Sequence, residues 1–127
     1  MSGVGATDVR AWSLASGLGR IAFGVGMLAA PEPALRKLGF ADVSPSTVAV
    51  TRLTGVRDLV LGLVTVAGLG DRDRLRRATV ANAVADTGDA LAFGIAMRTP
   101  ERDAAVRGLA AALPAAVAGC WTAWRLG

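Results

Sequence analysis

The residues best suited to chemistry in this sequence are charged side chains in the middle of long apolar segments. Three are basic and three are acidic: Arg20, Arg52, Arg57, Asp58, Asp86 and Asp89. An unpaired charge at the centre of a membrane-spanning helix costs roughly 2.5–3.5 kcal/mol on insertion scales. We therefore expect these side chains to face inward and to pair with one another. Charged groups in such a place are candidates for a functional site.

The aspartates suit acid/base chemistry. Asp86 and Asp89 lie three residues apart on one face of a helix, where two ionised carboxylates repel each other and one tends to keep a proton. A carboxylic acid beside a carboxylate can give and take protons or position a water molecule. If the protein is an enzyme, we expect Asp58, Asp86 and Asp89 to be catalytic. The reaction would be the hydrolysis, cyclisation or isomerisation of a lipid-soluble substrate.

The arginines and nearby neutral polar residues complete this candidate site. Arginine keeps its charge and can orient a carboxylate or stabilise an oxyanion through its planar fork. Asn82 lies one helical turn before Asp86, and Thr51 is next to Arg52. We predict substrate-binding roles for Arg20, Arg52, Arg57, Asn82 and Thr51.

The elements that must position these residues are four apolar segments, at residues 11–30, 46–69, 78–97 and 104–124. Each is long enough, at about 1.5 Å per residue, to cross about 30 Å of hydrocarbon. Helix-ending or helix-capping residues lie between them: Pro31, Pro33, Ser44-Pro45-Ser46, Gly68, Gly70 and Thr99-Pro100-Glu101. Short connections favour antiparallel neighbours. The sequence therefore predicts an all-α fold, a four-helix up-down transmembrane bundle that forms one domain over residues 1–127.

The charged residues fall at similar depths in these segments. Arg52 is the exception, because it lies between one and two turns nearer the start of its helix, but its long side chain can reach along the axis. Arg57 points about 100° away from Asp58, so it is expected to meet a different neighbour. The run Asp71–Arg77 is most simply a solvated turn. Glycines at positions 17, 24, 55 and 62 offer small surfaces where helix backbones can approach closely.

Composition supports the membrane class and excludes several others. Apolar residues make up 53% of the chain and the mean hydropathy is +0.47. The net charge of +4 does not form an amphipathic stripe or a recognition motif, so we expect no nucleic-acid partner. The chain has no histidine and one cysteine, so we expect no metal and no cofactor. A small excess of basic residues on one side predicts a multi-pass protein of the cell membrane with both termini cytoplasmic.

Two charged motifs carry a resemblance to a known family. They are Thr51-Arg52-Leu53-Thr54-Gly55-Val56-Arg57-Asp58 and Asp86-Thr87-Gly88-Asp89-Ala90, with the spacings Arg-x4-Arg-Asp and Asp-x2-Asp. In these motifs, and over nearly its whole length, the chain resembles an uncharacterised family of small four-helix integral membrane proteins of actinobacteria and fungi. The resemblance implies four spans with a polar centre. It implies no particular activity.

The sequence leaves several functions open. In the first, the charges line a pocket for a hydrophobic small molecule inside the lipid bilayer. In the second, they form a structural ion-pair network in a small carrier or accessory membrane subunit. A carrier of this size would need a second copy to build two gates, so this alternative predicts a homodimer. A helical bundle that is stable without detergent is the third.

Overall fold

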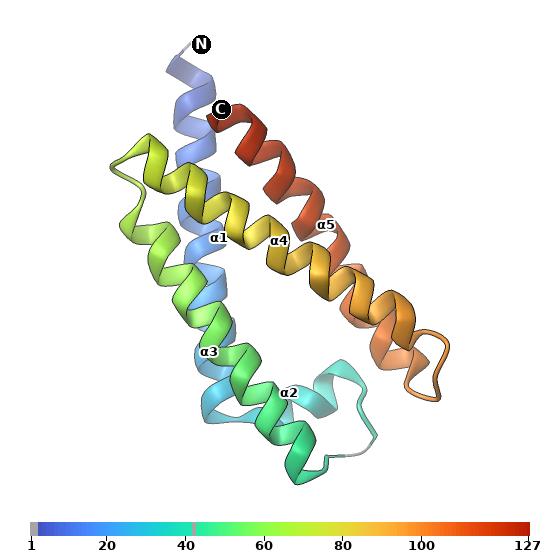
Figure 1. Ribbon diagram of the computed structural model, residues 1–127. Helices are drawn as coiled ribbons and strands as arrows, with labels where there is room; N and C mark the ends of the chain where they lie inside the picture. Colours follow the sequence, from blue (N-terminus) through green and yellow to red (C-terminus); the bar gives the residue numbers. More distant parts are fainter. Residues whose placement is uncertain (1–2, 42) are drawn as a thin grey trace.

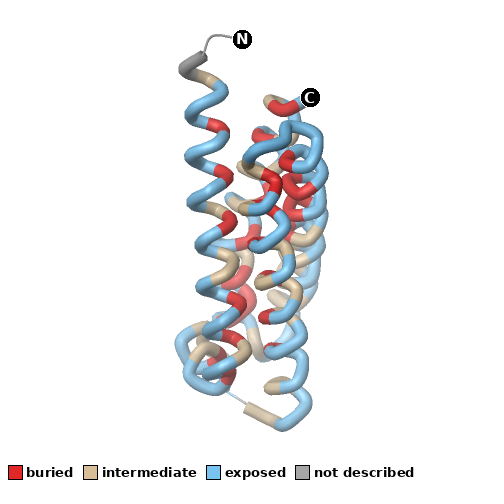
Figure 2. Tube along the Cα trace, turned by 90° about the vertical axis from the view of Figure 1, so that its left-hand side faces the viewer, coloured by how far each residue is buried: buried red, intermediate tan, exposed pale blue. Residues whose placement is uncertain are grey.

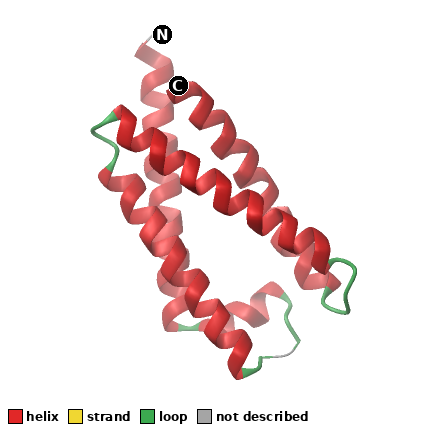
Figure 3. Ribbon diagram, in the orientation of Figure 1, coloured by secondary structure: helices red, strands yellow, loops and turns green. Residues whose placement is uncertain are grey.

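The chain is helical throughout most of its length. The computed structural model describes residues 3–41 and 43–127. It contains four long helices, α1 (Gly3–Ala29), α3 (Pro45–Ala67), α4 (Arg72–Ala96) and α5 (Arg102–Leu126), and one short helix, α2 (Pro31–Leu38) (Figure 1). The described residues include no strand (Figure 3), so the predicted all-α class is confirmed. All four predicted apolar segments lie within long helices, apart from one or two residues at the ends of three of them.

Several helices begin or end at the capping and helix-ending residues that the sequence indicates. Ser44 caps α3, because its hydroxyl accepts a hydrogen bond from the Thr47 backbone N–H at 3.2 Å, and Pro45 begins the helix. Gly68 ends α3. Pro31 follows the end of α1 but also begins α2, since proline fits the first turn of a helix. Gly39 ends α2 with a φ of 92°, which glycine adopts without steric cost.

The prediction of a solvated turn over Asp71–Arg77 was wrong. Only Asp71 precedes the helix, and α4 begins at Arg72. The Asp71 carboxylate accepts hydrogen bonds from the backbone N–H groups of Asp73 and Arg74, at 2.9 and 3.1 Å, which satisfies two donors that a helix start otherwise leaves free. The bond from Arg74, followed by the one from Asp73, lowers the pKa of Asp71. Arginine is also a good helix former, so a charged run after a cap continues the helix.

The four long helices form two pairs. α1 packs along α3, and α4 packs along α5, while α3 and α4 touch over a much shorter stretch. Figure 1 shows the two pairs close together at the end that holds both termini and the α3–α4 turn, and apart at the other end. The helices therefore run alternately up and down as predicted, but as two pairs that diverge rather than as an evenly packed bundle.

Glycines let α1 and α3 approach closely, as predicted. A Cβ atom added to Gly24 would lie 2.6 Å from the carbonyl oxygen of Gly55, and one added to Gly62 would lie 2.6 Å from that of Gly17. These separations are far below van der Waals contact. The close α1–α3 packing therefore depends on the missing side chains.

Many polar residues lie inside the molecule, and many large apolar residues lie outside. The buried polar residues are Ser13, Thr51, Asp58, Thr65, Thr79, Asn82, Asp86 and Thr122. The buried hydrophobic cluster is small and consists of Val9, Leu75 and Leu126, with Leu69 packed against it. By contrast, Leu53, Ile95 and Trp124 are 69%, 71% and 74% exposed. Figure 2 shows exposed residues along the whole length of the long helices.

Two of the described helical stretches, Gly5–Ala29 and Arg102–Leu126, are long and apolar enough to cross a membrane by length and composition. α3 and α4 are not, since α3 carries Arg52, Arg57 and Asp58, and α4 carries charges at its start and at Asp86 and Asp89. Two of the four predicted spans therefore meet this test of length and composition, and the other two do not.

Candidate functional site

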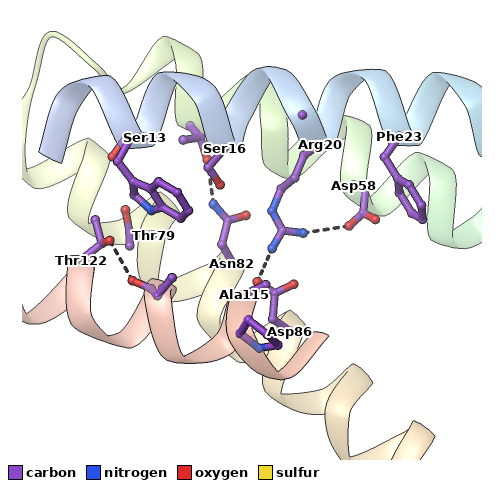
Figure 4. A pocket seen from close by; sticks show the side chains of 16 residues that line it. Ser13, Ser16, Arg20, Phe23, Asp58, Thr79, Asn82, Asp86, Ala115 and Thr122 are labelled. Carbon is purple, nitrogen blue, oxygen red and sulfur yellow. Dashed lines mark hydrogen bonds and ion pairs between the residues drawn. The ribbon is translucent and has the colours of Figure 1, made fainter. Parts of the chain in front are cut away.

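Arg20 joins three helices at the centre of the molecule. Its guanidinium, on α1, donates to Oδ1 of Asp58 on α3 at 3.0 Å and to Oδ2 of Asp86 on α4 (Figure 4). The side chains of Asp58 and Asp86 are 6% and 10% exposed. Because Asp86 belongs to one helix pair and Arg20 and Asp58 to the other, this arginine ties the two pairs together.

Arg57 extends the network toward the surface. Its two terminal nitrogens donate to the two carboxylate oxygens of Asp89, at 2.8 and 2.7 Å. Its Nη2 and Nε also donate to Asp58 Oδ1, at 3.3 and 3.4 Å. The ion pairs therefore run continuously from Asp86 through Arg20, Asp58 and Arg57 to Asp89. The predicted convergence of charges from three segments is confirmed for these five residues, as is the separate neighbour expected for Arg57.

Arg52 does not join this network, so the expectation that it reaches the cluster was wrong. Its side chain is exposed and takes part in none of the ion pairs found among the described residues. The buried face of α3 runs through Thr51, Gly55, Asp58, Gly62 and Thr65. At about 100° per residue, Arg52 lies to one side of this face and Arg57 to the other. Only the Arg57 side turns toward Asp89 on α4.

Thr51 is buried but does not contribute to the charged network. Its hydroxyl donates to the Thr47 carbonyl at 2.8 Å, within its own helix. The substrate-binding role predicted for Thr51 therefore has no contact with the charged network to support it.

The network contains more negative than positive charge. Without Arg52, three carboxylates face two guanidiniums. If all five groups are ionised, the network carries a net charge of −1 although each carboxylate contacts an arginine, and burial makes such an excess costly. A proton held by one carboxyl group, or a donor group of a ligand, would relieve it. The arrangement is therefore suited to proton transfer.

A pocket of about 400 Å³ opens beside the inner half of this network. It lies between the two helix pairs and receives residues from α1, α3, α4 and α5 (Figure 4). Arg20, Asp58 and Asp86 line it, whereas Arg57 and Asp89 do not. Its apolar lining residues are Trp12, Phe23, Pro114, Ala115 and Ala118. A pocket of this size that combines apolar walls with a few polar groups is typical of small-molecule sites.

Neutral polar residues line the rest of the pocket. Asn82, a predicted substrate-binding residue, donates from Nδ2 to Thr65 Oγ1 at 2.9 Å. Ser13, Ser16, Thr79 and Thr122 also line it. The sequence interpretation missed Thr65 and the part played by α5. The signal for α5 was present, because Ala115, Ala118, Gly119 and Thr122 are small residues that share one helical face.

No cluster of three or more histidine, cysteine, aspartate or glutamate side chains able to hold a metal ion occurs within residues 3–41 and 43–127. Instead, every carboxylate of the network is engaged by an arginine.

Comparisons with protein-family models, curated proteins and solved structures returned no match. The family resemblance of the two charged motifs therefore stays a prediction.

Proposed function

We propose that this chain is an integral membrane protein whose central pocket binds a hydrophobic small molecule. One observation carries the proposal: the buried Arg20–Asp58–Asp86 cluster lines an apolar-walled pocket of about 400 Å³ between the two helix pairs. Side chains that only held the helices together would need no such space beside them.

The distribution of side chains supports a bilayer around the protein. α3 and α4 carry the buried charges, yet their outward faces are apolar, with Leu53 and Leu63 exposed on α3, and Val84 and Leu91 exposed on α4. In water these faces would be costly, whereas in lipid they match their surroundings. We infer that α1, α3, α4 and α5 all cross the membrane. The start of α1 and the end of α5 lie at the same end of the molecule (Figure 1), which suits an even number of crossings with both termini cytoplasmic.

The inner carboxylates are placed for acid/base chemistry on the bound molecule. Within the described structure, the hydrogen bonds of Asp58 engage only Oδ1 and those of Asp86 engage only Oδ2. Each side chain lines the pocket and keeps a second oxygen for a substrate or a water. One could protonate a substrate while the other accepts a proton, as isomerisation or cyclisation requires; a carboxylate could also position a water for hydrolysis. Arg20 would hold both in place.

Asp89 has a different role in this proposal. Arg57 occupies both of its carboxylate oxygens, and Asp89 does not line the pocket. We therefore assign Asp89 to holding Arg57, and through it Asp58, rather than to contact with the substrate.

Filling the pocket tests the proposal. The protein would be placed in lipid nanodiscs, and saturable binding of tritiated 1-dodecanol above that of empty nanodiscs would be measured. Ala118→Phe puts a ring into the pocket, while Ala110→Phe puts the same ring at an exposed position of α5 that does not line the pocket. We expect Ala118→Phe to weaken binding at least tenfold and Ala110→Phe to change it less than twofold. Equal binding by both variants, or no saturable binding to the natural protein, would refute the proposal.

A second function is favoured by the completeness of the ion pairs. The two-point contact between Arg57 and Asp89, and the pairing of Arg20 with two aspartates, would suit a structural network in a small carrier or accessory subunit. This alternative predicts no saturable dodecanol binding. For a carrier, it also predicts a homodimer in detergent.

A further inference from the structure

At one end of the pocket, two buried polar atoms have no hydrogen-bond partner within the described structure. Asn82 and Ser13 line the pocket and are 6% and 3% exposed. The Oδ1 atom of Asn82 and the Oγ atom of Ser13 are buried and have no hydrogen-bond partner within the described part of the chain. Buried polar atoms in folded proteins are nearly always paired, with protein, water or ligand. These two atoms therefore indicate a binding partner that occupies the pocket.

The hydrogen bonds around Asn82 fix which way its amide points. Nδ2 donates to Thr65 Oγ1 at 2.9 Å, and the Thr65 hydroxyl in turn donates to the Leu61 carbonyl at 2.8 Å. A flipped amide would need the Thr65 proton, which is already used. Asn82 Oδ1 is therefore the free atom, and it can only accept a hydrogen bond.

The neighbouring hydroxyl groups are also mainly acceptors. Thr79 and Thr122 line the same part of the pocket (Figure 4) and donate their protons to the carbonyls of Leu75 and Ala118, both at 2.8 Å. Their oxygens can therefore accept but not donate. Ser13 keeps a proton that it can donate to a ligand. A ligand group that complements this end must donate to Asn82 and accept from Ser13, and a hydroxyl group does both.

We propose that the molecule in the pocket is an apolar alcohol. This inference rests on the proposed function. The hydroxyl group donates to Asn82 Oδ1 and accepts from Ser13, and the carbon skeleton extends from there past the charged cluster. Asn82 precedes Asp86 by four residues, or about 6 Å along the helix, so the carbons near Asp86 are a few bonds from the hydroxyl. An ether or an ester carbonyl lacks the proton that Asn82 requires.

The test compares two probes that differ in one proton donor. Saturable binding of 1-dodecanol and of its methyl ether, 1-methoxydodecane, would be measured with protein in nanodiscs. Asn82→Leu removes the Oδ1 acceptor and keeps a similar side-chain volume. Ser13→Ala removes a hydroxyl group that has no hydrogen-bond partner within the described structure, so the substitution breaks no hydrogen bond seen there. Ser46→Ala is the matched control, because it removes the hydroxyl of an exposed serine of α3 that does not line the pocket. Each variant would be checked for folding by its tryptophan fluorescence and its elution as a single species.

We expect the natural protein to bind the alcohol at least tenfold more tightly than the ether. Asn82→Leu and Ser13→Ala should each reduce this ratio to threefold or less, and Ser46→Ala should leave it unchanged. If Asn82→Leu does not fold, Ser13→Ala alone decides the matter. Equal binding of both probes by the natural protein, as a resident water on Asn82 would give, overturns the alcohol and leaves the pocket standing. Saturable binding of neither probe overturns the pocket as well.

Discussion

Arg20 is the residue on which the charged network depends most. It is the partner of both buried aspartates that line the pocket, and it lies on a different helix from each of them. Asp58 keeps a second, longer contact with Arg57, but the arginine contact of Asp86 is with Arg20. Removing Arg20 would leave Asp86 as a buried carboxylate without a cation.

The central place of Arg20 in the network predicts that replacing Arg20 by leucine and replacing Arg52 by leucine have very different effects on the free energy of unfolding. Arg20→Leu should destabilise the protein by about 3–5 kcal/mol, because breaking a buried pair from one side leaves the other charge uncompensated. Arg52→Leu, on the exposed side of α3, should change the free energy of unfolding by about 0.5 kcal/mol or less. Reversible unfolding in mixed micelles would measure both. Similar losses for the two variants would show that Arg20 is not paired as described.

The sequence indicated that the charged residues would pair with one another. It did not show which side of each helix would face the other helices. Charges within apolar segments must find partners, so the convergence of Arg20, Arg57 and the aspartates followed from the cost of burying them. The exclusion of Arg52 could not be predicted in the same way. It depends on which side of α3 faces α4, and that is decided by the packing of α1 against α3.

At the scale of the helices, glycines let α1 and α3 approach closely. The contact passes through Gly17 and Gly62 near one end and through Gly24 and Gly55 near the other. Because α3 carries Asp58 and α1 carries Arg20, the distance between these helices sets the geometry of the charged cluster.

Adding one methyl group to α1 should therefore have opposite effects at two neighbouring glycines. Gly24→Ala places a Cβ atom 2.6 Å from the Gly55 carbonyl oxygen, and we expect a loss of about 1–3 kcal/mol as the helices separate. Gly26→Ala meets nothing within 4 Å and should be neutral or stabilise by up to about 1 kcal/mol, since alanine favours the helix. Thermal unfolding in one detergent would compare them. A loss at Gly26 that matches the loss at Gly24 would contradict the packing.

The helix ends are features of the fold that the local sequence is sufficient to predict. Ser44, Pro45 and Gly68 act through their immediate neighbours, and the structure uses them as predicted. Asp71 acts in the same local way, but the charged run after it was interpreted as solvated loop instead of as the exposed first turns of α4. The divergence of the two helix pairs is a different matter, because it depends on contacts between segments far apart in the chain. The pocket arises from this divergence, so its volume and the contribution of α5 could not be predicted from local pattern.

Many large apolar side chains are exposed on the long helices, and the proposed membrane-spanning fold leads to a prediction about the topology of the whole molecule. In a Cys120→Ala background, single cysteines would replace Gly70, in the α3–α4 turn, and Thr99, in the α4–α5 turn. A membrane-impermeant maleimide added to intact cells should label the cysteine at position 99 and not the one at position 70, because the termini and the α3–α4 turn are expected on the cytoplasmic side.

The same experiment distinguishes the alternatives for the whole molecule. Labelling of position 70 alone would invert the orientation but keep the spans. Labelling of neither site in intact cells and of both in lysed cells, together with a protein that remains monodisperse without detergent, would contradict a membrane-spanning fold.

In the proposed function, a hydrophobic molecule enters the space between the two helix pairs beside Arg20 and Asp86. Photolabelling can detect such a molecule, with a dodecanol that carries a diazirine on its chain and with nanodisc-embedded protein. Mass spectrometry should find the label on pocket-lining residues such as Trp12, Ala115 and Ala118, and excess 1-dodecanol should abolish it. Label confined to outward residues such as Leu53 and Val84, and unaffected by competitor, would mean that the probe sees only the lipid-facing surface.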